Sequence, residues 1–236
     1  MSRATNHRLW LPALALAVHA GVAGAQLHTG DIDLEVPVSG GPIVTSGGDW
    51  TGTYAGRVFE GVMSSSQPYV ATSPGFDSLA GTFPVVPAPA QLRFDFVKQL
   101  LVWNGTALTT PTSALTVGFA SQTATITGSD VAGKAGFVIG PVSAQGAFHD
   151  HLDFSLPNGV ANGLYGVVMS LGPALGSTGF TTSEPFLITF LQGSVADVPG
   201  GMEALVNAAF VPEPSLAGFA LAAAAGVAVF LRGTKR

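Results

Sequence analysis

The chain contains no cysteine. That absence excludes disulfide bonds, thiol nucleophiles and cysteine metal ligands, so any metal must be held by histidine and carboxylate side chains. A folded domain must then be stabilised by its apolar core. The length of 236 residues and a hydrophobic content of 47% are sufficient for such a core.

Charged side chains are also scarce, and they are unevenly distributed. Residues 26–210 hold four basic and thirteen acidic side chains, a net charge of −9, whereas the whole chain has −5. The other five basic residues lie in the two terminal segments. We expect such an acidic surface to repel nucleic acid and anionic lipid and to be compatible with divalent cations, so no nucleic-acid partner is predicted.

Residues 1–25 have the pattern of a signal peptide. Arg3 and Arg8 form a basic start, Leu9–Val18 is an apolar stretch, and Ala23–Ala25 supplies small residues for cleavage. The segment predicts a helix that the general secretion machinery recognises and that signal peptidase removes. The domain that follows, 26–210, is therefore expected outside the cytoplasm.

A second apolar segment, Leu216–Leu231, is followed by a basic tail of Arg232, Lys235 and Arg236. As a helix it would span about 24 Å at about 1.5 Å per residue, short of a hydrocarbon core of about 30 Å. The basic residues favour a cytoplasmic position for residues 232–236. We expect a short transmembrane helix that holds the membrane transiently.

The segment 211–215, just before this helix, reads Val211-Pro212-Glu213-Pro214-Ser215. Pro214 disfavours helical geometry at its predecessor, so Glu213 is expected in an extended, accessible peptide. The order of motif, helix (216–231) and basic tail (232–236) resembles the PEP-CTERM sorting signal of exported bacterial proteins. That resemblance implies an exosortase as partner, an inner-membrane intermediate, and a final place at the cell surface or outside the cell among exopolysaccharide. The alternative is an ordinary single-span anchor.

Within 26–210, apolar residues alternate with polar ones in short runs separated by Gly, Pro, Asn and Ser. The runs are 31–36, 92–96, 115–119, 124–126, 137–139, 148–154, 165–171 and 186–190. They predict an all-β ectodomain of eight to ten short strands, a β-sandwich or jelly roll. Asn104-Gly105 and Asn158-Gly159 predict turns, and 39–90 is the least regular part. Residues 202–210 predict one or two helical turns.

Two histidines occur in the run 148–154. In a strand, Phe148, Leu152 and Phe154 would face the core, and the opposite face would hold His149, His151 and Asp153. Side chains two residues apart on one face lie roughly 6.6 Å apart, at about 3.3 Å per residue. Two imidazoles and a carboxylate at this spacing suit zinc or another divalent metal.

His28 is the expected fourth ligand, with Asp31 or Asp33 close behind it, if the first strand pairs nearby. The alternative is that all of these are solvated polar residues on an outer sheet face. The metal site is therefore a hypothesis that needs the fold to bring the two segments together.

No catalytic motif occurs: the chain has neither a Gly-x-Ser-x-Gly elbow nor a His-Glu-x-x-His helix. Residues 149–190 resemble a group of exported, surface-anchored β-domain proteins that share His-x-His, Gly-x-Tyr and Ser-x-Pro-Phe strands, a resemblance that implies the fold and no substrate. We expect a structural or binding protein and not an enzyme. The alternative is a secreted metal-dependent or glycan-active enzyme that uses the His149/His151 face.

Overall fold

The computed structural model describes residues 30–48, 50–86, 88–130 and 133–211. The expected signal peptide, His28, the sorting residues from Pro212 to Ser215, the apolar segment and the basic tail lie outside these residues. Within the described ranges, none of the helices combines the length and the apolar character that a membrane crossing requires.

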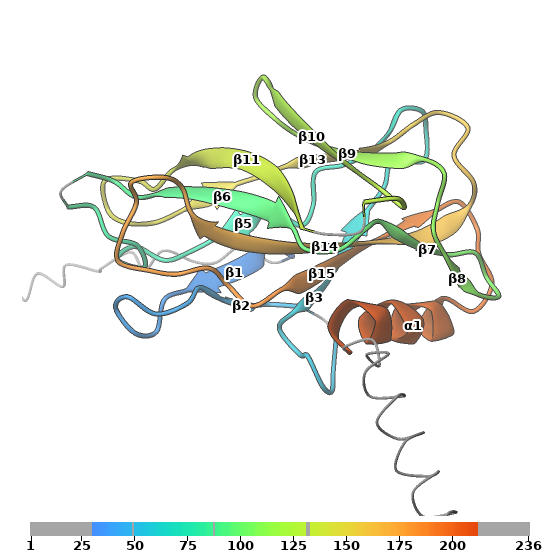
Figure 1. Cartoon of the computed structure of the whole chain (residues 1–236), viewed down its shortest axis with the longest axis horizontal. Coiled ribbons are helices and arrows are strands. Elements are labelled where there is room, and N and C mark those ends of the chain that lie inside the picture. The colour runs from blue at the N-terminus through green and yellow to red at the C-terminus, as the bar shows by residue number, and fades with distance from the viewer. Residues whose placement is uncertain (1–29, 49, 87, 131–132, 212–236) are drawn as a thin grey trace, which may run out of the picture.

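The described part of the chain is mostly β-sheet, as the alternation predicts (Figure 1). The strands are β1 (Ile32–Glu35), β2 (Val44–Ser46), β3 (Val58–Val62), β4 (Tyr69–Ala71), β5 (Phe76–Asp77), β6 (Gln91–Phe96), β7 (Leu101–Trp103), β8 (Leu108–Thr109), β9 (Ala114–Phe119), β10 (Gln122–Thr127), β11 (Lys134–Pro141), β12 (His149–Asp150), β13 (Asp153–Leu156), β14 (Gly163–Pro173) and β15 (Phe186–Gln192). Each of the eight alternating runs contains a strand. Five of the six strands that the alternation missed have only two or three residues, too few to establish a period of two; the sixth, β3, has five residues but reads Val-Phe-Glu-Gly-Val, which does not alternate.

The strands form three sheets. The largest has the order β11-β6-β14-β15-β3, and the β7–β8 hairpin extends it by pairing with β14. Two four-stranded sheets have the orders β10-β9-β13-β4 and β12-β5-β1-β2. Strands distant in sequence are therefore neighbours: β3 pairs in parallel with β15, and β1 pairs in parallel with β5.

One large core joins the three sheets. Phe154 of β13 packs against Phe190 of β15 with ring centroids 4.9 Å apart, and Phe76 of β5 packs edge-on against Phe186 of β15 at 6.1 Å. All four side chains are fully buried. Contacts of this kind between large rings contribute about 0.5–1.5 kcal/mol beyond the area they bury.

Both predicted turns are present. Asn104-Gly105 closes the β7–β8 hairpin: Oδ1 of Asn104 accepts hydrogen bonds from the backbone N–H groups of Thr106 and Ala107, each at 3.0 Å. Gly105 and Gly159 have φ values of 98° and 74°, a left-handed conformation that glycine adopts without steric cost.

A helix, α1 (Val198–Phe210), covers the outer face of the largest sheet, as Figure 1 shows. Its residues Met202, Leu205 and Val206 are buried in a second apolar cluster with residues of β14 and β15. The helix begins four residues before the predicted start. Pro at the beginning of a helix costs no hydrogen bond, and the carboxylate of Asp197 accepts one from Gly200 N–H at 3.1 Å, so the Pro-Gly-Gly start is stable despite its low helix propensity.

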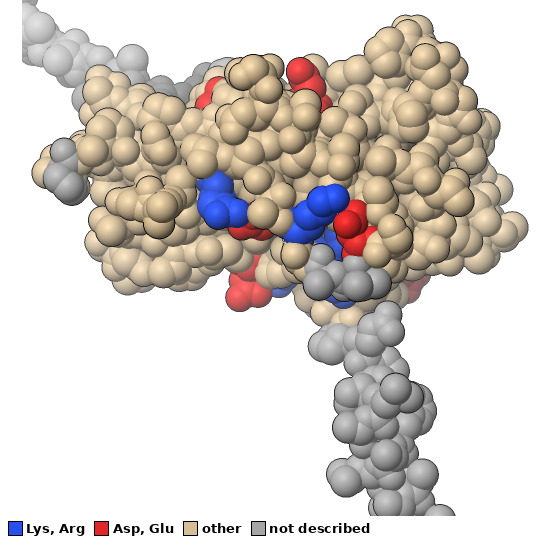
Figure 2. Space-filling view, turned by 45° about the horizontal axis from the view of Figure 1, so that its top comes forward, with Lys and Arg blue, Asp and Glu red and all other residues tan. Residues whose placement is uncertain are grey.

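The surface carries few charges. On the face in Figure 2, uncharged residues cover most of the area; the basic residues lie near the middle with several acidic ones, and other acidic residues lie at the upper edge. Ion pairs in the described residues include Arg93 with Asp95, and Lys134 with Asp130. Uncharged residues therefore dominate this face, in agreement with the 10% of charged residues in the sequence.

Candidate metal centre

Three adjacent strands place acidic and imidazole side chains in one row. Asp33 of β1 is the register partner of Asp77 of β5, and Asp77 is the register partner of His149 of β12. The neighbouring row holds Ile32 and Phe76, which are fully buried and face the core. Because side chains alternate along a strand, the row of Asp33, Asp77 and His149 lies on the opposite side of this sheet.

The chain leaves this sheet directly after β12. His151 and Leu152 belong to no strand, and β13 then joins the other four-stranded sheet. Leu152 remains fully buried, which anchors the crossing in the core, while His149 and His151 stay exposed on one side. The structure thus brings the two histidines together, as the alternation predicts, although it breaks the expected single strand.

Asp31, just before β1, completes a group of three potential metal ligands. Nε2 of His151 lies 3.6 Å and Nδ1 of His149 lies 4.0 Å from Oδ2 of Asp31. Ligand atoms of the three residues all lie within 4.8 Å of one another. Tetrahedral zinc, with bonds of about 2.0–2.1 Å, needs ligand atoms about 3.3 Å apart, so small side-chain rotations would complete the geometry.

The orientation of His151 is set by a backbone carbonyl. Its Nδ1 lies 2.8 Å from the oxygen of Thr72, and a carbonyl oxygen can only accept, so Nδ1 carries a proton. In the neutral ring, Nε2 then presents its lone pair to the carboxylate of Asp31. Two acceptors that face each other at 3.6 Å need a cation between them, either a proton or a metal. Metal-binding histidines commonly donate their other N–H to a carbonyl in this way.

The backbone at Gly75 approaches the group closely. Its N–H donates to Oδ1 of Asp31 at 2.8 Å, and Asp31 is only 5% exposed. A Cβ atom on Gly75 would lie 2.6 Å from Cε1 of His151 and 2.9 Å from Oδ1 of Asp31. Only glycine at this position therefore leaves both side chains where they are.

Carboxylates outnumber imidazoles around the site. Oδ1 of the buried Asp77 lies 3.6 Å from Nδ1 of His149. Burial, and then the charges of Asp77, Asp31 and Glu35, raise the pKa of Asp33 above its ordinary value. A raised pKa from neighbouring acids reports a negative local potential, which a cation would relieve.

A further acid lies behind the histidines. Burial raises the pKa of Asp150, and the nearby His149 and His151 offset part of that rise.

Imidazole nitrogens combined with carboxylate oxygens suit zinc and related divalent transition ions better than calcium, which prefers oxygen ligands alone. The donor set therefore fits a divalent transition metal.

The remaining predicted ligands are placed differently. Asp153 begins β13 opposite Gly118, is exposed, and is not part of the group formed by Asp31, His149 and His151. His28 lies outside the described residues. Asp77 was missed by sequence reasoning because its approach to His149 depends on the antiparallel pairing of β5 with β12, for which the sequence has no local signal.

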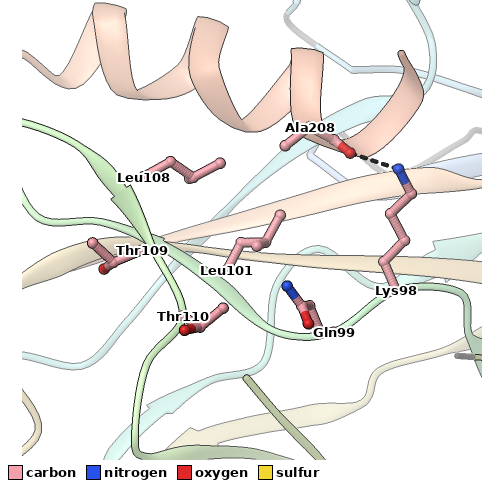
Figure 3. A pocket seen from close by; sticks show the side chains of 7 residues that line it. All are labelled: Lys98, Gln99, Leu101, Leu108, Thr109, Thr110 and Ala208. Atoms are coloured by element: carbon pink, nitrogen blue, oxygen red, sulfur yellow. Dashed lines mark hydrogen bonds between the residues drawn. The ribbon is translucent and has the colours of Figure 1, made fainter. Parts of the chain in front are cut away.

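A groove lies elsewhere, beside α1 and on the far side of the largest sheet from the strands that hold these residues. It measures about 830 Å³ and runs between the end of α1 and the β7–β8 hairpin (Figure 3). There the ammonium of Lys98 donates a hydrogen bond of 2.6 Å to the carbonyl of Ala208, in the last turn of α1. A cation at this end of a helix stabilises it, so Lys98 has a structural role.

Comparison of the chain with protein-family models, with curated proteins and with solved structures found no match. Its functional interpretation therefore rests on the geometry and chemistry of its own residues.

Proposed function

We propose that this chain is an exported structural or binding protein of the cell surface or extracellular matrix, and that a divalent metal fastens its β-domain together. The observation that carries the proposal is the position of Asp31 Oδ2 between His149 Nδ1 and His151 Nε2. We interpret the domain as a β-sandwich of the jelly-roll kind, in which the largest sheet packs against the two four-stranded sheets.

In this proposal the metal acts as a cross-link. It joins the start of the folded domain, at Asp31, to residues about 120 positions later in the chain. Because these ligands come together only in the folded chain, the metal stabilises the fold by binding to it preferentially. At a hundredfold excess of metal over the dissociation constant, binding would stabilise the fold by about 2.7 kcal/mol.

A secreted metal-dependent or glycan-active enzyme is the second candidate. It is favoured by the exposure of the histidine side chains, 42% for His149 and 39% for His151, because a metal held there would keep a position open to solvent. Catalytic zinc sites have three protein ligands and one such open position. The substrate would have to reach the metal from the side on which the two rings are exposed.

The proposal assigns delivery to the two terminal segments. The general secretion machinery and signal peptidase would handle residues 1–25, and an exosortase would recognise residues 211–215 at the inner membrane.

The folded domain provides a fixed starting point for that motif. Phe210 ends α1, its ring lies 4.5 Å from that of Tyr54, and the guanidinium of Arg57 lies 4.5 Å from its centroid. Val211, which follows, is 47% exposed.

Replacing Pro212-Glu213-Pro214 by three alanines tests the delivery. We expect export to continue and the full-length protein to accumulate in the inner membrane, because the extended recognition peptide is lost. Fractionation and immunoblotting measure this. Glu203→Ala, which removes an exposed acidic side chain of α1, is the control and should be processed normally. Trimming and release of the triple variant at the normal rate would contradict the proposal.

A further inference from the structure

A second groove lies at the edge of the largest sheet. It measures about 580 Å³ and lies along β3, which ends that sheet, between the end of β15 and the start of β4. We call it the β3–β4 groove; Glu60, Val62, Tyr69, Asn162, Leu191 and Gln192 are among its lining residues.

Gln192 is the most informative of these residues. It is the last residue of β15 and only 5% exposed, and no hydrogen bond joins its side-chain amide to another residue that the structure describes, although the amide is not among the fully buried polar groups. Because Gln192 lines the groove, a ligand or water in the groove is what can satisfy this amide.

A second amide is held beside it. Asn162 packs so closely on Gly193 that a Cβ atom there would collide with Oδ1 of Asn162. Gly193 has a φ of 66°, a left-handed conformation that favours glycine. In this conformation the backbone of Gly193 lies against the side chain of Asn162. The groove thus presents two amides, each with a donor and an acceptor, from adjacent ends of β14 and β15.

An apolar surface adjoins the amides. Val62 and Leu191 are register partners on β3 and β15, and they are 78% and 42% exposed. The half-buried ring of Tyr69 lines the groove from β4. The loop before Tyr69 is preformed, because the hydroxyl of Ser64 accepts from Val70 N–H at 3.0 Å. A hydrophobic face beside convergent polar groups is the usual composition of a small-molecule site.

We propose that the β3–β4 groove binds a neutral saccharide. A pyranose ring has an apolar C–H face that suits Tyr69 and the exposed aliphatic pair, and hydroxyl groups that both donate to and accept from the amides of Gln192 and Asn162. The carboxylate of Glu60 can accept from further hydroxyls, and it repels carboxylated or sulfated sugars. This inference rests on the proposed surface role, and it identifies the ligand class of that role.

Calorimetric titration of the purified full chain tests the site, in a detergent without a sugar headgroup. The probes are cellotetraose and mannotetraose, with tetragalacturonate as the anionic counterpart. We expect at least one neutral probe to bind and the anionic one not to bind. Gln192→Met, which keeps the volume and removes the amide, should weaken binding at least tenfold without lowering the melting temperature.

Gln99→Met, in the groove beside Lys98, is the matched control and should bind like the unmutated chain. Failure of both neutral probes, or equal affinity in Gln192→Met, overturns the saccharide site. Either result leaves the zinc response and the sorting of the protein unaffected, so it is distinguishable from failure of the proposed function. Conversely, saccharide binding without a zinc response would reject the metal cross-link alone.

Discussion

Nε2 of His151 lies 3.6 Å from Oδ2 of Asp31, and the opposite nitrogen of the same ring is fixed by the carbonyl of Thr72. His151 follows β12 and Asp31 precedes β1, and these two strands are separated in the sheet by the short strand β5. Their proximity is therefore a product of the fold, and a metal bound between them would add measurably to the free energy of unfolding.

Zinc is expected to raise the melting temperature of the unmutated protein at neutral pH. A double change, His149→Ala with His151→Ala, should abolish that rise and leave the metal-free protein almost unchanged, because both side chains are partly exposed. Imidazole must be neutral to coordinate, so the zinc effect should fade below pH of about 6.5, where free histidine titrates. Differential scanning calorimetry with zinc and with a chelator measures both effects.

Asp153→Ala is the matched control for this experiment. The alternation along one strand groups Asp153 with the histidines, whereas the structure places it in another sheet, outside the group around Asp31. Asp153→Ala should keep the full zinc effect, and Asp31→Asn should lose most of it. A melting curve of the unmutated protein that does not respond to zinc would rule out the metal site.

Local pattern predicts much of this fold, because period-two alternation marks each strand long enough to show it. The Asn104-Gly105 turn is predicted for the same reason: its conformation depends on two neighbouring residues. The pairings of β5 have no such local cause: its pairing with β12 brings Asp77 beside His149, and its pairing with β1 brings Asp77 beside Asp33. The change of sheet at His151 likewise depends on where Leu152 is buried. The sequence could therefore indicate the histidines, but it could not select among the acids.

Gly75→Ala is expected to damage the site without removing any ligand. The added methyl group would lie 2.7 Å from Nδ1 of His151 and 2.9 Å from Oδ1 of Asp31, closer than ordinary contacts allow. We expect a loss of about 1–3 kcal/mol in the free energy of unfolding, typical of overpacking, together with a loss of the zinc effect. Chemical denaturation with and without zinc measures both.

Gly118→Ala is the control for backbone stiffening in a strand, because a Cβ atom there meets nothing closer than 3.8 Å. It should leave the zinc effect intact. If Gly75→Ala retains the full zinc response, the close packing of Gly75 on His151 has no part in metal binding.

The dependence of stability on pH should differ in sign between two aspartates. The pKa of Asp33 is raised by burial and by the charges of Asp77 and Asp31, so its contribution to stability is complete below the ordinary value of 3.8 and is lost as pH rises through the raised pKa. Asp33→Asn should therefore raise the melting temperature of the chelated protein at pH 7 and have little effect at pH 3. Bound zinc offsets the same negative charge, so the gain should shrink when the metal is present.

Asp130 provides the opposite case. Its carboxylate accepts hydrogen bonds from the hydroxyl of Thr127 at 2.8 Å and from the backbone N–H of Thr127 at 2.7 Å, and Lys134 lies nearby. These contacts lower the pKa of Asp130, so its contribution is present above 3.8 and is lost as pH falls through the lowered pKa. Asp130→Asn should lower the melting temperature at pH 7, and the loss should diminish in acid. Melting curves from pH 3 to pH 8 measure both variants. Of the two residues, only Asp33 lies among the carboxylates that a cation would neutralise. If the melting temperatures of both variants change in the same direction at pH 7, the negative potential at the metal centre is contradicted.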